Sequence, residues 1–138
     1  MCRNRKGFTL VEVLWVIMFL GLLAGIIAPK FSDATTEAKI ANLTNNLQHV
    51  RAQLELYRLQ HNNSYPTDIV TQLTSKTDDD GTINPDGACG PYMQFFPDNR
   101  FIDDPAKSDA IDGAAGDGWS YDPSTGTFRA NSAGHEEL

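Results

Sequence analysis

The sequence predicts an α+β protein in which one long amino-terminal helix packs on a small antiparallel sheet. Two patterns predict the helix: an apolar run over residues 8–29, and apolar residues at alternating steps of three and four over residues 40–57. Near the carboxyl end, bulky residues alternate on both sides of a turn at residues 122–126, which is typical of a β-hairpin. At 138 residues the chain has room for one domain.

The apolar run follows a basic leader, residues 1–7, and from residue 8 to residue 28 its single ionisable side chain is Glu12. At about 1.5 Å rise per residue the run forms a helix of roughly 30 Å, the thickness of a bilayer's hydrocarbon core. We therefore expect this helix to cross a membrane. Glu12 needs a partner there, because a carboxylate inside the hydrocarbon costs about 2.5–3.5 kcal/mol.

The string Lys-Gly-Phe-Thr-Leu-Val-Glu-Val-Leu at residues 6–14 resembles the processing site of type IV pilins and of the pseudopilins of type II secretion systems. In that family a prepilin peptidase cuts after the glycine, and the new terminal phenylalanine is N-methylated. The resemblance implies a cut between Gly7 and Phe8, and it implies that Glu12 neutralises the terminal amine of a neighbouring subunit. The family's helix-loosening glycine and proline have counterparts at Gly21 and Pro29.

Three other kinds of amino terminus are less consistent with these residues. A secretory signal peptide needs a small-x-small cleavage site after its apolar core, but here the core runs on to Pro29 and Lys30. A lipoprotein signal needs a cysteine after the core, and Cys2 precedes it. An ordinary single-span anchor explains the apolar length and the flanking charge, but not Gly7 at the polar–apolar junction or Glu12 one turn inside.

The chain is accordingly expected to have four parts in a pilin-like arrangement. They are a cytoplasmic leader (1–7), an apolar transmembrane and assembly segment (8–30), the amphipathic half of the same helix (31–62), and a globular head with a carboxy-terminal hairpin (63–138). The amphipathic half is expected to pack on the chain's own head, because its pattern lasts under three heptads; a coiled-coil dimer is the alternative.

His49 and His61 are expected in solvent rather than on a metal. A short helix carrying Ile69 and Leu73 is expected after a cap at Thr67 or Asp68.

Composition excludes some partners. The formal net charge is −7, and removal of Arg3, Arg5 and Lys6 with the leader leaves −10, which disfavours nucleic acid. Cys2 would leave with the leader, so Cys89 would have no partner for a disulfide within the mature chain.

Calcium is the one cofactor that the resemblance suggests. Major pseudopilins bind calcium in their carboxy-terminal loops, and Asp112, Asp117 and Asp122 lie in the comparable region, although this chain departs from the longer glycine-rich loop of the family. The acidic stretch at residues 78–81 fails the EF-hand spacing and is expected to be a solvated turn.

The predicted function is structural. The resemblance implies a subunit of a type II secretion pseudopilus that polymerises through its amino-terminal helix and drives the export of folded proteins. A type IV pilus subunit for adhesion, motility or DNA uptake is the alternative. No catalytic motif is present in the sequence, so we expect no enzyme; a membrane-anchored hydrolase using the Asp103–Asp104 pair would leave Gly7 and Glu12 unexplained.

The resemblance also implies partners and a location. The expected partners are further copies of the chain, other pseudopilins, the prepilin peptidase, an inner-membrane platform protein and an assembly ATPase. The basic leader is expected to stay cytoplasmic, which places the chain once through the inner membrane, with its head in the periplasm and later in a periplasmic filament.

Processing is the first testable prediction. We expect the mature chain to begin at an N-methylated Phe8, because Gly7 offers the peptidase an unhindered backbone at the junction. Gly7→Leu is expected to block the cut. Intact-mass analysis of membrane-extracted protein, with the unchanged chain as control, measures both. A mature form that retains residues 1–7 would contradict the prediction.

Overall fold

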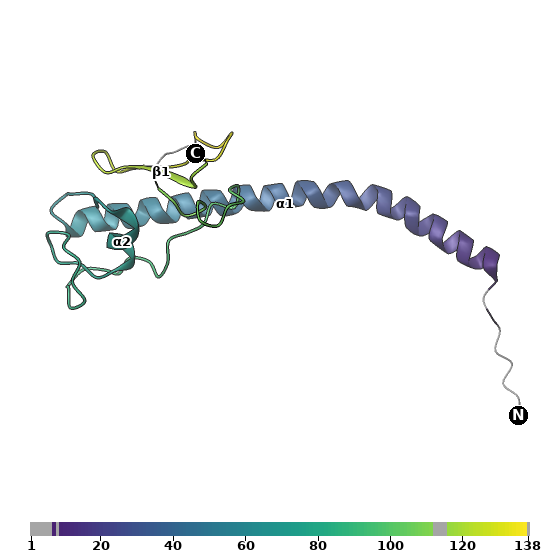
Figure 1. Cartoon of the computed structure of the whole chain (residues 1–138), viewed down its shortest axis with the longest axis horizontal. Helices are drawn as coiled ribbons and strands as arrows, with labels where there is room; N and C mark the ends of the chain where they lie inside the picture. Colours follow the sequence, from purple (N-terminus) through teal and green to yellow (C-terminus); the bar gives the residue numbers. More distant parts are fainter. Residues whose placement is uncertain (1–6, 8, 112–115, 138) are drawn as a thin grey trace, which may run out of the picture. The chain divides into compact units, whose positions relative to one another are not determined.

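The long helix and the small antiparallel sheet are both present. A computed structural model of the chain describes residues 7, 9–111 and 116–137; the side chains of residues 26–34 lie outside that description. The elements are helix α1 (Leu10–Gln60), helix α2 (Ile69–Thr74), strand β1 (Trp119–Asp122) and strand β2 (Thr127–Ala130), in that order (Figure 1). Contacts divide the chain into two compact units, Met1–Ala38 and Lys39–Leu138.

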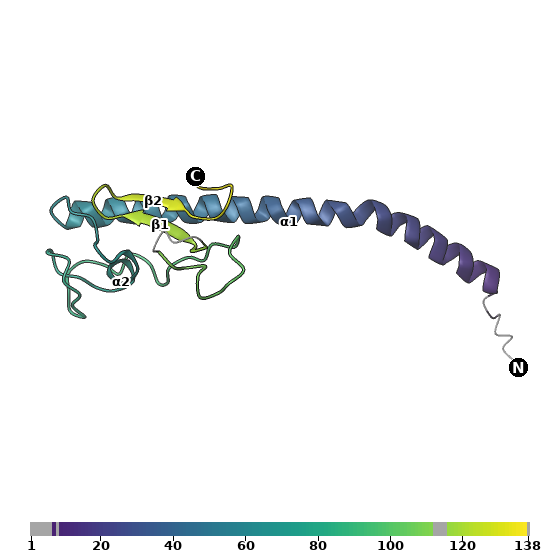
Figure 2. The ribbon, with the colours of Figure 1, turned by 45° about the horizontal axis from the view of Figure 1, so that its top comes forward.

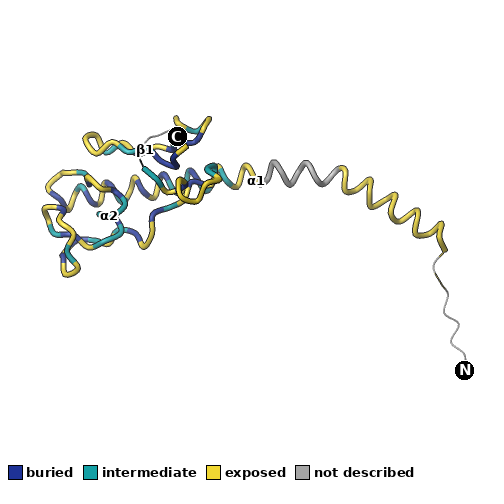
Figure 3. Tube along the Cα trace, in the orientation of Figure 1, coloured by how far each residue is buried: buried dark blue, intermediate teal, exposed yellow. Residues whose placement is uncertain are grey.

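In the second unit, helix α1 buries one stripe and leaves its other faces in solvent (Figure 3). The stripe consists of Leu43, Leu47, Val50, Leu54 and Tyr57, none more than 2% exposed. Steps of three and four residues place these side chains on one face of a helix. Ile40, the first residue of the predicted apolar face, is 39% exposed. The packed stripe therefore begins one turn later.

Strands β1 and β2 form the predicted hairpin. Their register pairs Trp119 with Ala130, Ser120 with Arg129, Tyr121 with Phe128 and Asp122 with Thr127. The turn closes where the carbonyl of Asp122 accepts the N–H of Gly126 at 2.8 Å. Gly126 has φ of +72°, and a Cβ at this position would collide with the ring of Tyr65. Only glycine meets both conditions without strain.

The inner face of the hairpin closes the core over α1. Trp119 and Phe128 are fully buried, and their ring centroids lie 5.1 Å apart. The indole Nε1–H of Trp119 donates to the carbonyl of Pro97 at 2.9 Å, so its polar atom is satisfied. Arg51 on α1 donates from Nε and Nη2 to the carbonyl of Phe128, at 3.1 and 2.9 Å. The hairpin consequently lies along the carboxy-terminal part of α1 (Figure 2).

Helix α2 and the loops after it complete the head. Asp68 is the cap of α2, as expected, because its Oδ1 accepts the N–H of Thr71 at 3.2 Å. Between α2 and β1 the described residues form turns and two isolated bridges from Thr77, to Ile83 and to Cys89. In this stretch Phe96 packs into the core, whereas Phe95 is 76% exposed.

The core generates a stability prediction. Trp119→Ala removes the fully buried indole, and we expect the free energy of unfolding to fall by about 3–5 kcal/mol, because the transfer energy is lost and a cavity remains. Phe95→Ala is the matched control: this ring is exposed, so the change is expected to stay within about 0.5 kcal/mol. Denaturant unfolding of the full chain in detergent measures both. Equal effects of the two substitutions would contradict this core.

Candidate assembly site on the amino-terminal helix

The start of α1 is capped by Thr9. Its Oγ1 accepts the N–H of Glu12 at 3.3 Å, and its carbonyl accepts the N–H groups of Glu12 and Val13 at 3.1 and 3.3 Å. Threonine is favoured at this position because it satisfies an N–H that has no partner within the helix. Glu12 is thus the third helical residue, where a negative charge interacts favourably with the helix dipole. The Thr-x-x-Glu spacing of residues 9–12 is that of a capping box, a local signal in the sequence for this helix start.

Beyond this cap, α1 is apolar on every face through residue 23. All the side chains of residues 10–23 are exposed, and among the large apolar ones the exposed fraction runs from 50% at Val13 to 82% at Leu10. Trp15 and Phe19 contact each other one turn apart, with ring centroids 6.0 Å apart. Monomeric soluble proteins rarely expose contiguous apolar patches above a few hundred Å². Such a surface is typical of a helix that other helices or lipid cover.

Within the part of the chain that the structure describes, none of the helices has a stretch long and apolar enough to cross a membrane. The segment predicted to cross, residues 8–30, includes Phe8 and the side chains of residues 26–30, which lie outside that part. The long helix is confirmed, and its membrane crossing stays a prediction.

The other residues singled out at this end are placed as follows. Gly7 is exposed, and a Cβ there would meet no heavy atom within 4 Å; the same holds at Gly21. Phe8 lies outside the described residues. Pro29 lies within α1, but its side chain is not described. The cut, the methylation and the loosening of the helix therefore stay predictions.

The three candidate calcium ligands are not brought together by the described residues. Asp112 lies outside them, and Asp117 is buried with 7% exposure. Asp122 is engaged in the hairpin turn: its Oδ1 accepts the N–H and Oγ–H of Ser124, at 2.9 and 2.6 Å, and its Oδ2 accepts the hydroxyl of Thr125 at 2.9 Å. These hydrogen bonds lower the pKa of the Asp122 carboxyl. Among the described residues no group of three or more His, Cys, Asp or Glu could hold a metal ion.

His61 corrects a prediction, because it is buried, at 2% exposure, rather than solvated. Its Nδ1 lies 2.8 Å from the carbonyl of Tyr57 and its Nε2 lies 2.9 Å from the hydroxyl of Thr77. A carbonyl only accepts, so Nδ1 carries a proton and donates it to Tyr57, while the Thr77 hydroxyl can donate to or accept from Nε2. The ring stacks on Tyr57 with centroids 3.7 Å apart. His61 thus joins the end of α1 to the loop after α2.

The groups around His61 are unsuited to catalysis near neutral pH. Burial is the main cause that raises the pKa of Tyr57, and it raises the pKa of Tyr92 to about 12. The hydroxyl of Tyr92 donates to Oε1 of Gln60 at 2.6 Å. Cys89 is a free, buried thiol whose pKa is raised, first by burial and then by the nearby Asp79 carboxylate. Both phenols and the thiol stay protonated, so this cluster stabilises the head instead of supplying a base or nucleophile.

Comparison with known proteins shows similarity to type II secretion system proteins and to type IV pilus components. Type II secretion system core protein G of Pseudomonas aeruginosa is 32% identical over 65 residues, which cover 47% of this chain and 45% of that protein. The core protein G of Aeromonas hydrophila is 35% identical over 65 residues, with the same coverage. The type IV narrow pilus major component of Thermus thermophilus is 38% identical over 55 residues, 40% of this chain and 47% of that protein.

The predicted resemblance is confirmed. The chain spans about half the length of the curated relatives that it matches. No family model matches it, and no solved structure does. The names of these pseudopilin and pilin relatives denote parts of secretion systems and pili rather than enzymes, in agreement with a structural role.

Calcium has a direct test. If the carboxy-terminal loops bind calcium, chelation lowers the melting temperature of the full chain, since a ligand that binds only the folded state stabilises it by mass action. We expect Asp117→Asn to abolish this difference and Asp86→Asn, in a separate loop, to preserve it. Thermal melts with calcium and with chelator measure each chain. Superimposable melting curves of the unchanged chain with calcium and with chelator would contradict calcium binding.

Proposed function

We propose that this chain is a structural subunit of a type II secretion pseudopilus, which polymerises through α1 and drives the export of folded proteins. The observation that carries the proposal is the exposed, uniformly apolar surface of residues 10–23, interrupted by one carboxylate, Glu12. A surface of this kind requires a cover of lipid or of other helices. The similarity to core protein G of type II secretion systems supports the secretion assignment.

The surroundings of the apolar segment change during assembly. Before assembly, lipid of the inner membrane surrounds residues 8–30, with the leader in the cytoplasm and the head in the periplasm. In the filament the helices of neighbouring subunits replace the lipid. One apolar environment is exchanged for another, so the exchange involves little hydrophobic free energy, and close packing and polar pairs decide the arrangement.

Glu12 is the polar group that sets this arrangement. Its place in the first turn of α1 is worth about 0.3–1 kcal/mol through the helix dipole. That is less than the roughly 2.5–3.5 kcal/mol that a carboxylate costs within the hydrocarbon. The helix end alone therefore does not compensate Glu12. The amine of Phe8 in an adjacent subunit supplies the missing partner, and this pair fixes the register of neighbouring helices.

The same proposal includes the machinery that acts on the chain. A prepilin peptidase cuts between Gly7 and Phe8, an inner-membrane platform protein receives the processed subunit, and a cytoplasmic ATPase drives addition of subunits. The filament contains further copies of this chain and other pseudopilins.

A type IV pilus subunit is the second candidate, and the similarity to a pilus component of Thermus thermophilus favours it. Many pilins carry a disulfide in their carboxy-terminal region, whereas Cys89 is free and buried here. The secretion pseudopilus is therefore the preferred assignment. Neighbouring genes separate the two: secretin and platform genes favour secretion, and a retraction ATPase gene favours a pilus.

The test of the proposal is Glu12→Leu. Loss of the carboxylate leaves the terminal amine of the neighbouring subunit unpaired, and breaking a buried pair in this way costs about 3–5 kcal/mol. We expect filament yield to fall more than about a hundredfold, since each 1.4 kcal/mol is a factor of ten. Cleavage at Gly7 is expected to continue, because the peptidase reads the junction.

Val11→Leu is the matched control, since it changes an apolar side chain in the same turn and is expected to leave both filaments and cleavage intact. Filament yield and processing state are measured together in cells that express the assembly machinery. Normal filaments from processed Glu12→Leu chains would show that the carboxylate has no role in assembly, and the proposed pair between Glu12 and the Phe8 amine would be rejected.

A further inference from the structure

The head carries an open groove between α1 and the turn of the hairpin. Two hollows of about 680 and 530 Å³ share Tyr65 and Thr125, and together they form this groove. Three arginines line it: Arg51 and Arg129 in the first hollow and Arg58 in the second. We call it the arginine groove.

The arginine groove concentrates positive charge on an acidic head. Residues 39–138 contain seven lysines and arginines against fifteen aspartates and glutamates, a net charge of −8. Three of the seven cations line the groove, beside two carboxylates, Glu55 and Glu137. Arg58 pairs with Glu55, with Nη1 and Oε2 3.4 Å apart. The groove is therefore a cationic site on a surface that is otherwise anionic, and it fits an acidic partner.

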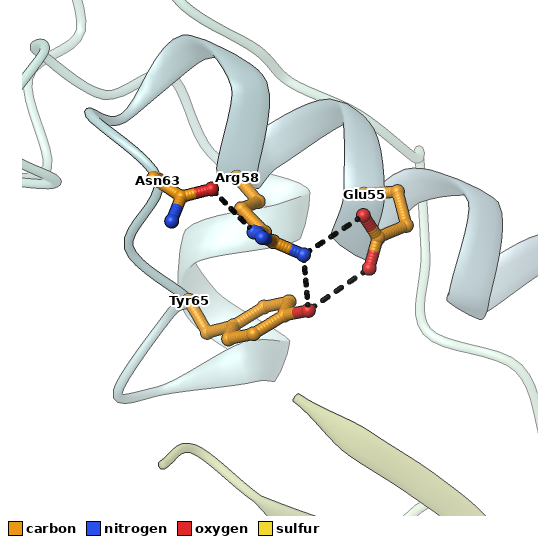
Figure 4. Close-up of polar contacts among 4 residues, drawn as sticks. All are labelled: Glu55, Arg58, Asn63 and Tyr65. Carbon is orange, nitrogen blue, oxygen red and sulfur yellow. Dashed lines mark hydrogen bonds and ion pairs between the residues drawn. The ribbon is translucent and has the colours of Figure 1, made fainter. Parts of the chain in front are cut away.

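Two of the arginines, Arg58 and Arg51, are held in place by the fold, and Figure 4 shows the contacts of Arg58. Arg58 donates from Nε to Oδ1 of Asn63 at 2.7 Å and from Nη1 to the hydroxyl of Tyr65 at 3.0 Å, and its guanidinium lies 5.3 Å from the centroid of the Tyr65 ring. The hydroxyl of Tyr65 in turn donates to Oε1 of Glu55 at 2.9 Å. Arg51 is bonded to the carbonyl of Phe128. Because these side chains are already ordered, the entropic cost of binding a partner is lower.

The acidic loop of residues 98–109 lies alongside a different part of α1. Nδ2 of Asn46 donates to the carbonyl of Asp98 at 3.2 Å, and Nζ of Lys39 lies 5.7 Å from the centroid of the Phe101 ring. The loop exposes four aspartates and two cations: Asp98, Asp103, Asp104, Asp109, Arg100 and Lys107. Asp103 and Asp104 are adjacent, and Oδ1 of Asp104 accepts the N–H of Ala106 at 3.0 Å, which orders that carboxylate.

The two surfaces are offset along the axis of α1. The acidic loop lies beside residues 39–46, whereas α1 contributes residues 51–58 to the groove. At about 1.5 Å per residue the offset is roughly 18 Å. Parallel copies shifted by this distance bring the loop of one chain to the groove of the next. Such a head-to-tail contact joins two different patches and extends without closing, as a filament requires.

We propose that the arginine groove receives the Asp103–Asp104 pair of a neighbouring copy of this chain, an inference that rests on the assembly proposed above. The guanidinium group of Arg129 suits a carboxylate, because it can donate two parallel hydrogen bonds. Arg58, whose Nε and Nη1 already donate to Asn63, Tyr65 and Glu55, adds a fixed positive charge beside it. The other acidic loop, at residues 78–81, lies at the same end of the head as the groove, since Nε2 of Gln72 in α2 donates to the carbonyl of Gly81 and this glycine packs on the Tyr57 hydroxyl. A shift of one copy along the axis of α1 therefore does not bring its loop at residues 78–81 to the groove of the neighbouring copy.

The test is a charge exchange in the full-length chain. Arg129→Glu and Asp103→Lys each place like charges in the contact, and we expect each to lower filament yield at least about tenfold. The double variant restores opposite charges and is expected to return the yield to within about twofold of the unchanged chain. Arg129→Lys and Asp86→Lys are the controls: the first keeps the charge, and the second alters an exposed aspartate away from the contact.

A second measurement uses proximity. The double variant Asp103→Cys with Thr125→Cys is expected to yield disulfide-linked dimers and longer ladders in assembled filaments, and neither substitution alone is expected to do so. Normal filaments from both single reversals, failure of the double variant to restore yield, or absence of cross-linking would each overturn the proposal. Loss of filaments in Glu12→Leu beside normal filaments in Arg129→Glu would reject the groove contact and leave the proposed function standing.

Discussion

The head depends on the packing of one stripe of α1 against the inner face of the hairpin. Each large apolar side chain buried there contributes about 1.5–3 kcal/mol, and the stripe from Leu43 to Tyr57 meets Trp119 and Phe128 at the centre of the core. The polar groups within this contact are satisfied, since the indole of Trp119 and the carbonyl of Phe128 both have partners. An unpaired polar group there would cost about 1–3 kcal/mol and offset much of the gain. The hairpin therefore has one stable position on the helix.

The same helix has a different relation to its surroundings near its start. Over residues 10–23 the apolar side chains have no cover within the described chain, and Thr9 and Glu12 complete the helix end. A surface of this composition is stable only against lipid or other helices. One helix, α1, therefore contributes to the core of the head and also carries the apolar surface that we assign to assembly.

Charge is distributed unevenly over the head. The hydrogen bonds of Tyr65 and Asn63 hold Arg58 beside the hairpin turn, and the acidic loop of residues 98–109 lies alongside an earlier part of α1. A head with net charge of −8 would repel its copies if its charges were evenly spread. Separation of the two signs along the helix axis converts part of this repulsion into attraction between shifted copies. It also favours head-to-tail contacts over symmetric pairs, in which like patches would meet.

The sequence alone determined the long helix, a cap of α2 at Thr67 or Asp68, the hairpin around residues 122–126 and the resemblance at residues 6–14. These are local signals, because helix periodicity, caps and turns depend on residues within a few positions of one another. The cap of α1 at Thr9 is indicated by the same kind of local signal, the Thr-x-x-Glu spacing of residues 9–12. These features determine which helices and strands form, but not how those elements pack against one another.

Only the tertiary structure decided the rest. It buried His61 against Thr77, left Ile40 half exposed, set Gly126 under the Tyr65 ring and gathered Arg51, Arg58 and Arg129 around one groove. Arg58 and Arg129 are 71 positions apart, so no local pattern links them. Burial and proximity depend on where the hairpin and the loops settle over α1. That placement results from the fit of many distant side chains into one close-packed core.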